Sequence, residues 1–177
     1  MRRPSVLVPA VLFVLAGAAA AETPNFAGKW RPDPQRSTSE KTLKPAAGDP
    51  NVEAPPAPAP TQAGHPIELI EQNGSTIKIT LHDEEGEPTN TLTLSTNGEE
   101  IFQEMSGGAL QYVSRTHWDG ESLVVEWRME RDGRPMIWGK DVRTLEGPGI
   151  QRLVRDLEDA KSRTHSIILL VRDRAVP

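Results

Sequence analysis

Glycine-containing turns recur along most of this sequence, and their regular spacing restricts the possible folds more than any other feature does. From Asn73-Gly74 to Gly147-Pro148-Gly149, a turn pair such as Asn-Gly, Asp-Gly or Gly-Gly appears about every 10 to 15 residues. The segments between these turns are short and rich in Ile, Val, Leu, Thr and Trp. Such a pattern is typical of consecutive hairpins, so the sequence predicts an all-β, antiparallel meander.

Ten short segments fit between the turns as strands. We expect them near residues 26–31, 66–72, 75–82, 89–95, 99–105, 109–118, 121–130, 135–145, 150–157 and 164–172. The segment 150–161 is ambiguous, because its apolar residues also recur at helical spacing. The last strand needs a neighbour in the meander, however, and 159–162 makes an acceptable turn. We therefore expect a strand here rather than a helix.

The first glycine turn allows a strand register to be predicted. A three-residue loop at 72–74 would pair Leu69 with Ile77 and Glu68 with Lys78. This register separates an apolar face from a charged one, whereas a two-residue Asn-Gly turn would mix the two. We therefore expect Glu68 to point to solvent.

The hairpin at Asp119-Gly120 predicts a face that mixes apolar and hydroxyl-bearing side chains. With a two-residue loop, alternate residues of 109–118 lie beside alternate residues of 121–130. The opposite face would pair Val113 with Glu126 and would be solvated. The shared face carries Leu110, Tyr112, Ser114, Thr116, Leu123, Val125, Trp127 and Met129.

The N-terminal end has the pattern of a secretory leader. Arg2 and Arg3 precede a short apolar stretch, and Ala19 and Ala21 satisfy the small-residue rule for cleavage. We therefore expect residues 1–21 to be a signal peptide that is removed. The alternative, a retained anchor, is disfavoured because the apolar stretch is short for a membrane span.

Composition limits the compartment and the partners. The sequence has no cysteine, which excludes a disulfide framework, a thiol nucleophile and a cysteine-linked lipid anchor. Loss of the leader removes two of the 20 basic residues and none of the 25 acids, so the formal charge falls from −5 to −7. An acidic surface disfavours nucleic acid and anionic membranes as partners. We expect a periplasmic or secreted protein with no stable membrane insertion after cleavage.

Residues 45–66 differ from the rest of the chain in composition. Pro, Ala, Gly and Gln dominate, with Pro55-Pro56-Ala57-Pro58 near the centre. Proline-rich segments favour extended polyproline conformations and do not build a packed core. We expect a long surface loop here; a lid over a cavity is the less common alternative.

The first predicted strand carries a motif that resembles a known group of barrels. Gly28-Lys29-Trp30 precedes a long antiparallel meander, and the chain ends on an apolar strand that contains Arg172. This arrangement resembles the calycins: lipocalins, avidins and fatty-acid-binding proteins. The opening from Asn25 and the segment Trp118-Asp119-Gly120-Glu121-Ser122-Leu123-Val124 also look like secreted bacterial lipocalin-like proteins of uncharacterised function.

The resemblance implies a closed, lipocalin-like barrel of about 8–10 strands, formed by residues 22–177 as one domain. In calycins, the tryptophan closes one barrel end and a basic side chain of the last strand covers its indole. Arg172 is the expected partner of Trp30, with Arg174 as the alternative. No binding residue is transferred, because the lipocalin Thr-Asp-Tyr signature and the Arg-x-Tyr pair of fatty-acid-binding proteins are both missing.

The residues give no sign of catalytic or metal chemistry. The four histidines, at 65, 82, 117 and 165, do not have a recognised metal spacing. The cluster His82-Asp83-Glu84-Glu85 lacks the alternating ligands and central glycine of a calcium loop. No Gly-x-Ser-x-Gly or phosphate-binding glycine loop is present. We therefore expect no metal and no cofactor, and binding rather than catalysis.

Aromatic and hydroxyl side chains in the middle of the chain suggest a ligand site. A dry barrel core would favour larger aliphatic residues over hydroxyls, and small barrels can hold one ligand. Filling the core is the alternative role of the tryptophans. The expected ligand-binding residues are Tyr112, Ser114, Thr116, Trp127 and Trp138.

The sequence therefore predicts an exported barrel that binds a small apolar or amphipathic molecule. A structural or interaction module with a filled barrel is the second hypothesis. An envelope hydrolase with paired carboxylates is the third, since two acids can converge in space without any sequence signal.

Overall fold

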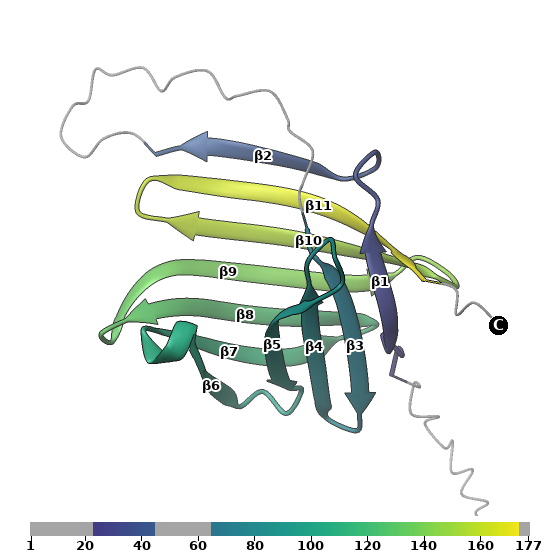
Figure 1. Cartoon of the computed structure of the whole chain (residues 1–177), viewed down its shortest axis with the longest axis horizontal. Helices are drawn as coiled ribbons and strands as arrows, with labels where there is room; N and C mark the ends of the chain where they lie inside the picture. Colours follow the sequence, from purple (N-terminus) through teal and green to yellow (C-terminus); the bar gives the residue numbers. More distant parts are fainter. Residues whose placement is uncertain (1–22, 45–64, 174–177) are drawn as a thin grey trace, which may run out of the picture.

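The computed structural model describes residues 23–44 and 65–173, which form one antiparallel sheet curled into a nearly closed barrel (Figure 1). A single 3-10 turn, Ser106–Gly108, interrupts the strands in this part of the chain. The strands are β1 Gly28–Pro32, β2 Thr38–Leu43, β3 Ile67–Asn73, β4 Thr76–His82, β5 Pro88–Ser95, β6 Glu100–Met105, β7 Leu110–Asp119, β8 Ser122–Arg131, β9 Arg134–Leu145, β10 Ile150–Asp159 and β11 Ser162–Arg172.

The neighbour order of the strands confirms the predicted meander. It runs β5-β4-β3-β1-β11-β10-β9-β8-β7-β6, so the N-terminal β1 joins the C-terminal β11 to the hairpins β3 to β5. Figure 1 shows β7 to β11 as one wall of long strands and β1, β3, β4 and β5 as a shorter wall that crosses it. This architecture is that of a calycin-like barrel, as the sequence indicated.

The barrel is closed between β5 and β6 by a side chain rather than by a strand ladder. The Gln103 amide on β6 accepts a hydrogen bond from the Thr93 N–H at 2.7 Å and donates to the Thr93 carbonyl at 3.0 Å. It therefore takes the place of one peptide group in a ladder. A single bidentate contact satisfies the backbone of Thr93 where the two strands diverge.

Ten of the eleven strands were expected from the sequence, and β2 was not. Its sequence, Thr-Ser-Glu-Lys-Thr-Leu, lacks the apolar alternation of a half-buried strand. It pairs with the first half of β11, on the same edge that β1 occupies further along. The Ser39 and Ser166 hydroxyls lie 2.9 Å apart across this pairing.

The predicted register of the β3–β4 hairpin is wrong. The loop is the two-residue Gly74–Ser75, and β3 pairs Ile70 with Ile79 and Glu71 with Lys78. As a result Glu68 faces the barrel interior and is fully buried, while Leu69 is exposed. The prediction failed because it placed Glu68 in solvent. In the structure, Glu68 pairs with a buried cation from a distant part of the chain.

The β7–β8 hairpin has the predicted face but a shifted register. Its loop is Gly120–Glu121, so Thr116 pairs with Val125 and Ser114 with Trp127. Val113 therefore lies opposite Arg128 rather than Glu126, and it is fully buried although its face was expected to be solvated. A shift of two residues preserves which side chains share a face, because strand side chains alternate with a period of two.

The ambiguous segment 150–161 is the strand β10 and its turn, as we expected. Asp159 ends the strand, and its Oδ1 accepts hydrogen bonds from the N–H groups of Lys161 and Ser162, both at 2.7 Å. The expected leader, 1–21, and nearly all of the proline-rich loop, 45–66, lie outside the described residues. Among the described residues, no helix is long and apolar enough to cross a membrane.

Two aromatic side chains near the start of the described residues belong to the buried core of the barrel. Trp30 and Phe26 are fully buried, and the Trp30 indole donates to the Phe26 carbonyl at 2.8 Å. The Arg172 guanidinium carbon lies 4.7 Å from the centroid of the Trp30 ring, a cation-π contact across the β1–β11 pairing. Gly28 leaves room for this arginine, since a Cβ there would lie 3.2 Å from Arg172 Nε.

Candidate functional site

Four of the five expected ligand-binding residues lie together on the inner face of the long wall. Tyr112, Ser114 and Thr116 alternate along β7, and Trp127 lies opposite Ser114 on β8. The Tyr112 and Trp127 rings are stacked, with centroids 5.7 Å apart. Tyr112, Ser114 and Thr116 are buried, and Trp127 is partly buried against the core.

The fifth residue, Trp138, does not lie with them. Its neighbour Gly139 is the cross-strand partner of Trp127, so Trp138 projects from the opposite, outer face of β9. It is 45% exposed. Gly139 has a specific packing role, because a Cβ at this position would lie 2.2 Å from the Trp127 ring. The Trp127 indole therefore occupies the space in which a side chain at position 139 would lie.

A buried ion pair connects the two walls of the barrel. Arg143 on β9 donates to both carboxylate oxygens of Glu68 on β3, at 2.6 and 2.8 Å, and His65 Nε2 lies 2.8 Å from Glu68 Oε1. Burial opposes the charge of Glu68, but Arg143 and the His65 hydrogen bond outweigh it and hold the carboxyl pKa far below its ordinary value. Glu68 is therefore an anion inside the barrel at neutral pH.

A second ion pair lies beside the stacked aromatic rings. Arg155 on β10 donates to both oxygens of Asp141 on β9, at 2.9 and 2.6 Å. The Trp127 indole N–H also donates to Asp141 Oδ1, at 3.3 Å. Burial, reinforced by the charge of Asp141, raises the pKa of Tyr112 above its ordinary value, so its phenol remains neutral.

Several polar atoms inside the barrel are buried without a hydrogen-bond partner in the structure. They include Ser114 Oγ, Thr116 Oγ1 and both amide atoms of Gln151. These side chains are at most 2% exposed. A buried polar group without a partner costs about 1–3 kcal/mol. Such groups are usually satisfied by ordered water or by a ligand.

The end of the long wall that lies away from β1 carries apolar side chains on its inner face (Figure 1). Figure 1 shows that the long strands extend beyond the short wall at this end. Inward positions there carry the half-buried side chains Met129, Ile137 and Leu157. The inner face of the long wall therefore passes from apolar side chains at this end to a polar middle layer and then to the aromatic core around Trp30.

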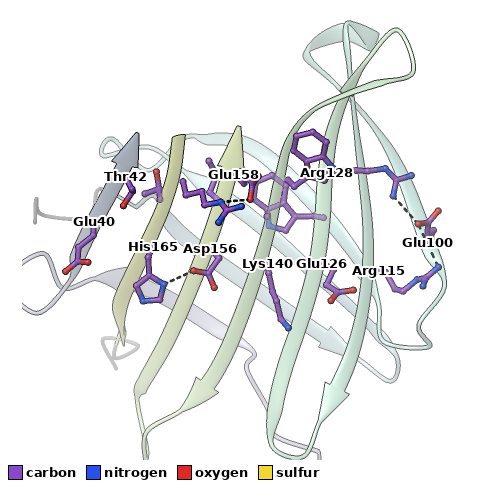
Figure 2. A pocket seen from close by; sticks show the side chains of 16 residues that line it. Glu40, Thr42, Glu100, Arg115, Glu126, Arg128, Lys140, Asp156, Glu158 and His165 are labelled. Carbon is purple, nitrogen blue, oxygen red and sulfur yellow. Dashed lines mark hydrogen bonds and ion pairs between the residues drawn. The ribbon is translucent and has the colours of Figure 1, made fainter. Parts of the chain in front are cut away.

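The second candidate site is a groove of about 810 Å³ on the outer face of the long wall (Figure 2). Two rows of side chains border it. The first, the charged row, contains Glu40, His165, Asp156, Lys140, Glu126, Arg115 and Glu100. The second row contains Thr42, Arg163, Glu158, Trp138 and Arg128. The residues between the rows are Thr164, Leu157, Gly139 and Trp127. We call this site the outer groove.

Acidic residues alternate with Lys, Arg or His along the whole charged row. Each residue is the cross-strand partner of the next, from β2 through β11, β10, β9, β8 and β7 to β6. His165 Nδ1 lies 2.6 Å from Asp156 Oδ1, and Arg128 Nη1 from the second row lies 3.1 Å from Glu100. Cross-strand pairs of opposite charge stabilise this register.

Sequence reasoning missed the charged residues of the interior. Asp141 and Arg143 alternate with outward residues on β9, and both share a face with Gly139. The only sequence signal was this alternation, since the partners Glu68 and Arg155 lie on other strands. Residues 23–44 and 65–173 contain no group of three or more His, Asp or Glu arranged to hold a metal ion.

Comparison with known proteins identifies no relative by sequence. No protein-family model matches this chain. No curated protein matches it either. Among solved structures, the chain is similar to a mutant of the fluorescent protein UnaG, with 19% identity and a TM-score of 0.45. The similarity covers 85% of this chain and 97% of UnaG.

Proposed function

We propose that this protein is an exported, non-enzymatic barrel that binds a small amphipathic molecule without net charge in its interior. The observation that carries the proposal is the buried pair of hydroxyls, Ser114 and Thr116, whose oxygens have no partner in the structure. They lie two residues apart on β7, beside the stacked Tyr112 and Trp127 rings. A ligand with one polar end and one apolar end would satisfy both features.

The charge balance of the interior supports a neutral ligand. Glu68 is paired with Arg143, and Asp141 is paired with Arg155, each through two hydrogen bonds. Each of these charges is neutralised by its partner, so none is free to bind an ionic head group. Moving a charged ligand into this layer would require breaking a pair or burying an unpaired charge, and both cost several kcal/mol.

The interior carboxylates do not support a hydrolase. A general acid needs a raised pKa near the working pH, whereas the pKa of Glu68 is held well below its ordinary range. Asp141 is engaged by Arg155 and by the Trp127 indole. Glu68 is therefore unsuited to act as a general acid, and both oxygens of Asp141 are occupied by Arg155.

Export is the second part of the proposal. It is supported by the leader pattern, in which two arginines precede an apolar stretch and a small-residue cleavage position. A periplasmic or secreted location also agrees with a chain that contains no cysteine.

A competition assay tests the ligand class. The uncharged fluorophore N-phenylnaphthylamine is bound to the protein and then displaced with dodecanol, dodecanoate or dodecylamine. We expect dodecanol to compete at least about tenfold more tightly than either ion, because only the ions must bury a charge. Displacement that favours dodecanoate, or absence of fluorophore binding, would contradict the proposal.

Two variants connect the assay to the structure. Ser114→Ala combined with Thr116→Val should weaken dodecanol and leave the fluorophore bound, because it removes hydroxyls and keeps apolar volume. Thr144→Val, on the outer face of β9, is the matched control and should change neither affinity. If the interior and control variants change dodecanol affinity equally, the two hydroxyls do not take part in binding.

A further inference from the structure

The outer groove differs from the interior site, because its two rows of side chains project from the other face of the same strands. Trp127 and Gly139, which lie between the rows, are shared by the two sites. Trp138 on the outer face and Gly139 on the inner face illustrate this alternation. A twisted barrel wall is saddle-shaped, so its outer surface is concave along the strands even though it is convex across them. The groove runs across seven strands, a span of roughly 29 Å at about 4.8 Å per strand.

The charges that line the groove nearly cancel. Its two rows contain five acidic side chains, four Lys or Arg side chains and His165. The groove is therefore within one charge of neutral. A polyanion such as nucleic acid would meet five carboxylates, and a polycation would meet four positive groups. The charge balance favours an uncharged ligand.

The backbone of the groove floor is not available to a peptide. Thr164, Leu157 and Gly139 lie on strands that are paired on both sides, so their N–H and C=O groups are engaged in the sheet. Peptides that bind by adding a strand need a free edge. Same-side residues of an extended peptide also repeat at about 6.8 Å, which does not match the strand spacing of about 4.8 Å.

A folded protein partner is also disfavoured. The centres of protein interfaces are depleted of charged residues, particularly Lys, Glu and Asp. The middle of the outer groove carries Lys140 and Glu126. A flat partner would bury both charges, at a cost that their mutual attraction repays only with good geometry.

The middle of the groove has the side chains that a neutral polyhydroxyl chain requires. Within the described residues, Lys140 and Glu126 have no ionic partner within 4.0 Å, whereas Glu100 at one end of the charged row lies 3.1 Å from Arg128 and 3.9 Å from Arg115. An ammonium and a carboxylate offer a donor and an acceptor, and each sugar hydroxyl can serve as either. Trp138, with 45% of its surface exposed, supplies an aromatic face beside them.

We infer that the outer groove binds a linear, uncharged oligosaccharide. Sugar rings would stack their apolar face on Trp138, while their hydroxyls bind Lys140 and Glu126. The length of a pyranose unit is close to the spacing between strands, so successive rings meet successive donor and acceptor positions of the charged row. The groove volume, about 810 Å³, accommodates several rings.

Isothermal titration with four uncharged hexasaccharides tests the inference: maltohexaose, cellohexaose, laminarihexaose and chitohexaose. We expect at least one to bind the full chain at millimolar concentration or below. Trp138→Ala should weaken that binding by about tenfold, the effect of one aromatic stacking contact. Phe102→Ala is the matched control, since Phe102 is an exposed aromatic residue on the outer face that does not line the groove.

The outcomes are separable from those of the interior site. Binding of the hexasaccharide should persist when dodecanol is present, and polygalacturonate and hexalysine should not compete with it. The inference is overturned if none of the four hexasaccharides binds, if Trp138→Ala and Phe102→Ala behave alike, or if a charged polymer binds more tightly. None of these results would bear on displacement of the interior fluorophore.

Discussion

Arg143 and Glu68 join the two walls of the barrel through a bidentate pair with distances of 2.6 and 2.8 Å, across 75 residues of sequence. Their strands, β9 and β3, are not neighbours in the sheet. Both side chains are at most 3% exposed. The pair therefore acts as a cross-brace between the walls, in the layer where the polar interior begins.

Breaking this pair should be costly. Glu68→Gln leaves the Arg143 guanidinium buried without its counter-ion, and we expect a loss of about 3–5 kcal/mol in the free energy of unfolding. Urea denaturation measures it. Replacing both residues with methionine should restore most of the loss, because two apolar side chains need no partner. If the double variant is as unstable as Glu68→Gln, the loss does not come from the unpaired charge.

The same pair predicts how stability depends on pH. The pKa of Glu68 is lowered in the folded state, so its contribution is fully present above the pKa of an unfolded glutamate, about 4.3. The contribution is lost as pH falls below that value toward the folded-state pKa. Melting temperatures measured from pH 7 down to pH 3 should fall more steeply for the natural protein than for Glu68→Gln. Parallel curves would contradict this assignment.

Part of this fold could be predicted because its signals are local. Glycine turns and strand alternation depend on neighbouring residues, and they located every strand except β2. β2 has no local signal, since it is held only by β11, more than a hundred residues away. The predicted register of β3 was wrong for the same reason, because no residue near Glu68 in the sequence indicates that Arg143 pairs with it.

The sequence predicted which aromatic and hydroxyl side chains of β7 and β8 share a face, but it did not predict the charged residues beside them. Alternation along β7 and β8 placed Tyr112, Ser114 and Trp127 on one face, because the period of two survives a shift of two residues. Trp138 was assigned to the same interior from its aromatic character alone, although the adjacent Gly139 occupies the inward position.

Gly139 should be intolerant of any side chain. A Cβ at this position would overlap the Trp127 ring, so Gly139→Ala must displace the indole and break its hydrogen bond to Asp141. We expect a loss of about 1–3 kcal/mol in the free energy of unfolding. Tryptophan fluorescence should shift to longer wavelength as the ring gains exposure. Gly133→Ala is the control for a glycine with no atom within 4 Å of its Cβ position, although its positive φ adds some strain.

The aromatic end of the barrel should depend on the Arg172 side chain. Arg172→Ala removes the cation above Trp30, and we expect a loss of about 1 kcal/mol, as for an exposed cation-π contact. Arg172→Lys should retain part of it. Thermal unfolding of the natural protein and the two variants measures their order of stability. If Arg172→Ala is as stable as the natural protein, the contact does not contribute to stability.

The side chain that closes the barrel between β5 and β6 should control local opening. Gln103→Leu removes the two hydrogen bonds to the Thr93 backbone while keeping similar volume. We expect faster amide hydrogen exchange at Thr93 and little change in the β8–β9 hairpin. Unchanged exchange at Thr93 would show that the contact does not hold the two strands together.

Native mass spectrometry of the protein, purified from its own cells, tests the central claim most directly. We predict a mature chain that begins at Glu22 and carries one small molecule without net charge, which is released on unfolding. The variant with Ser114→Ala and Thr116→Val should carry less of it than Thr144→Val does. A chain recovered only in the empty form, or with an ionic molecule bound, would contradict a barrel that binds a neutral amphipathic ligand.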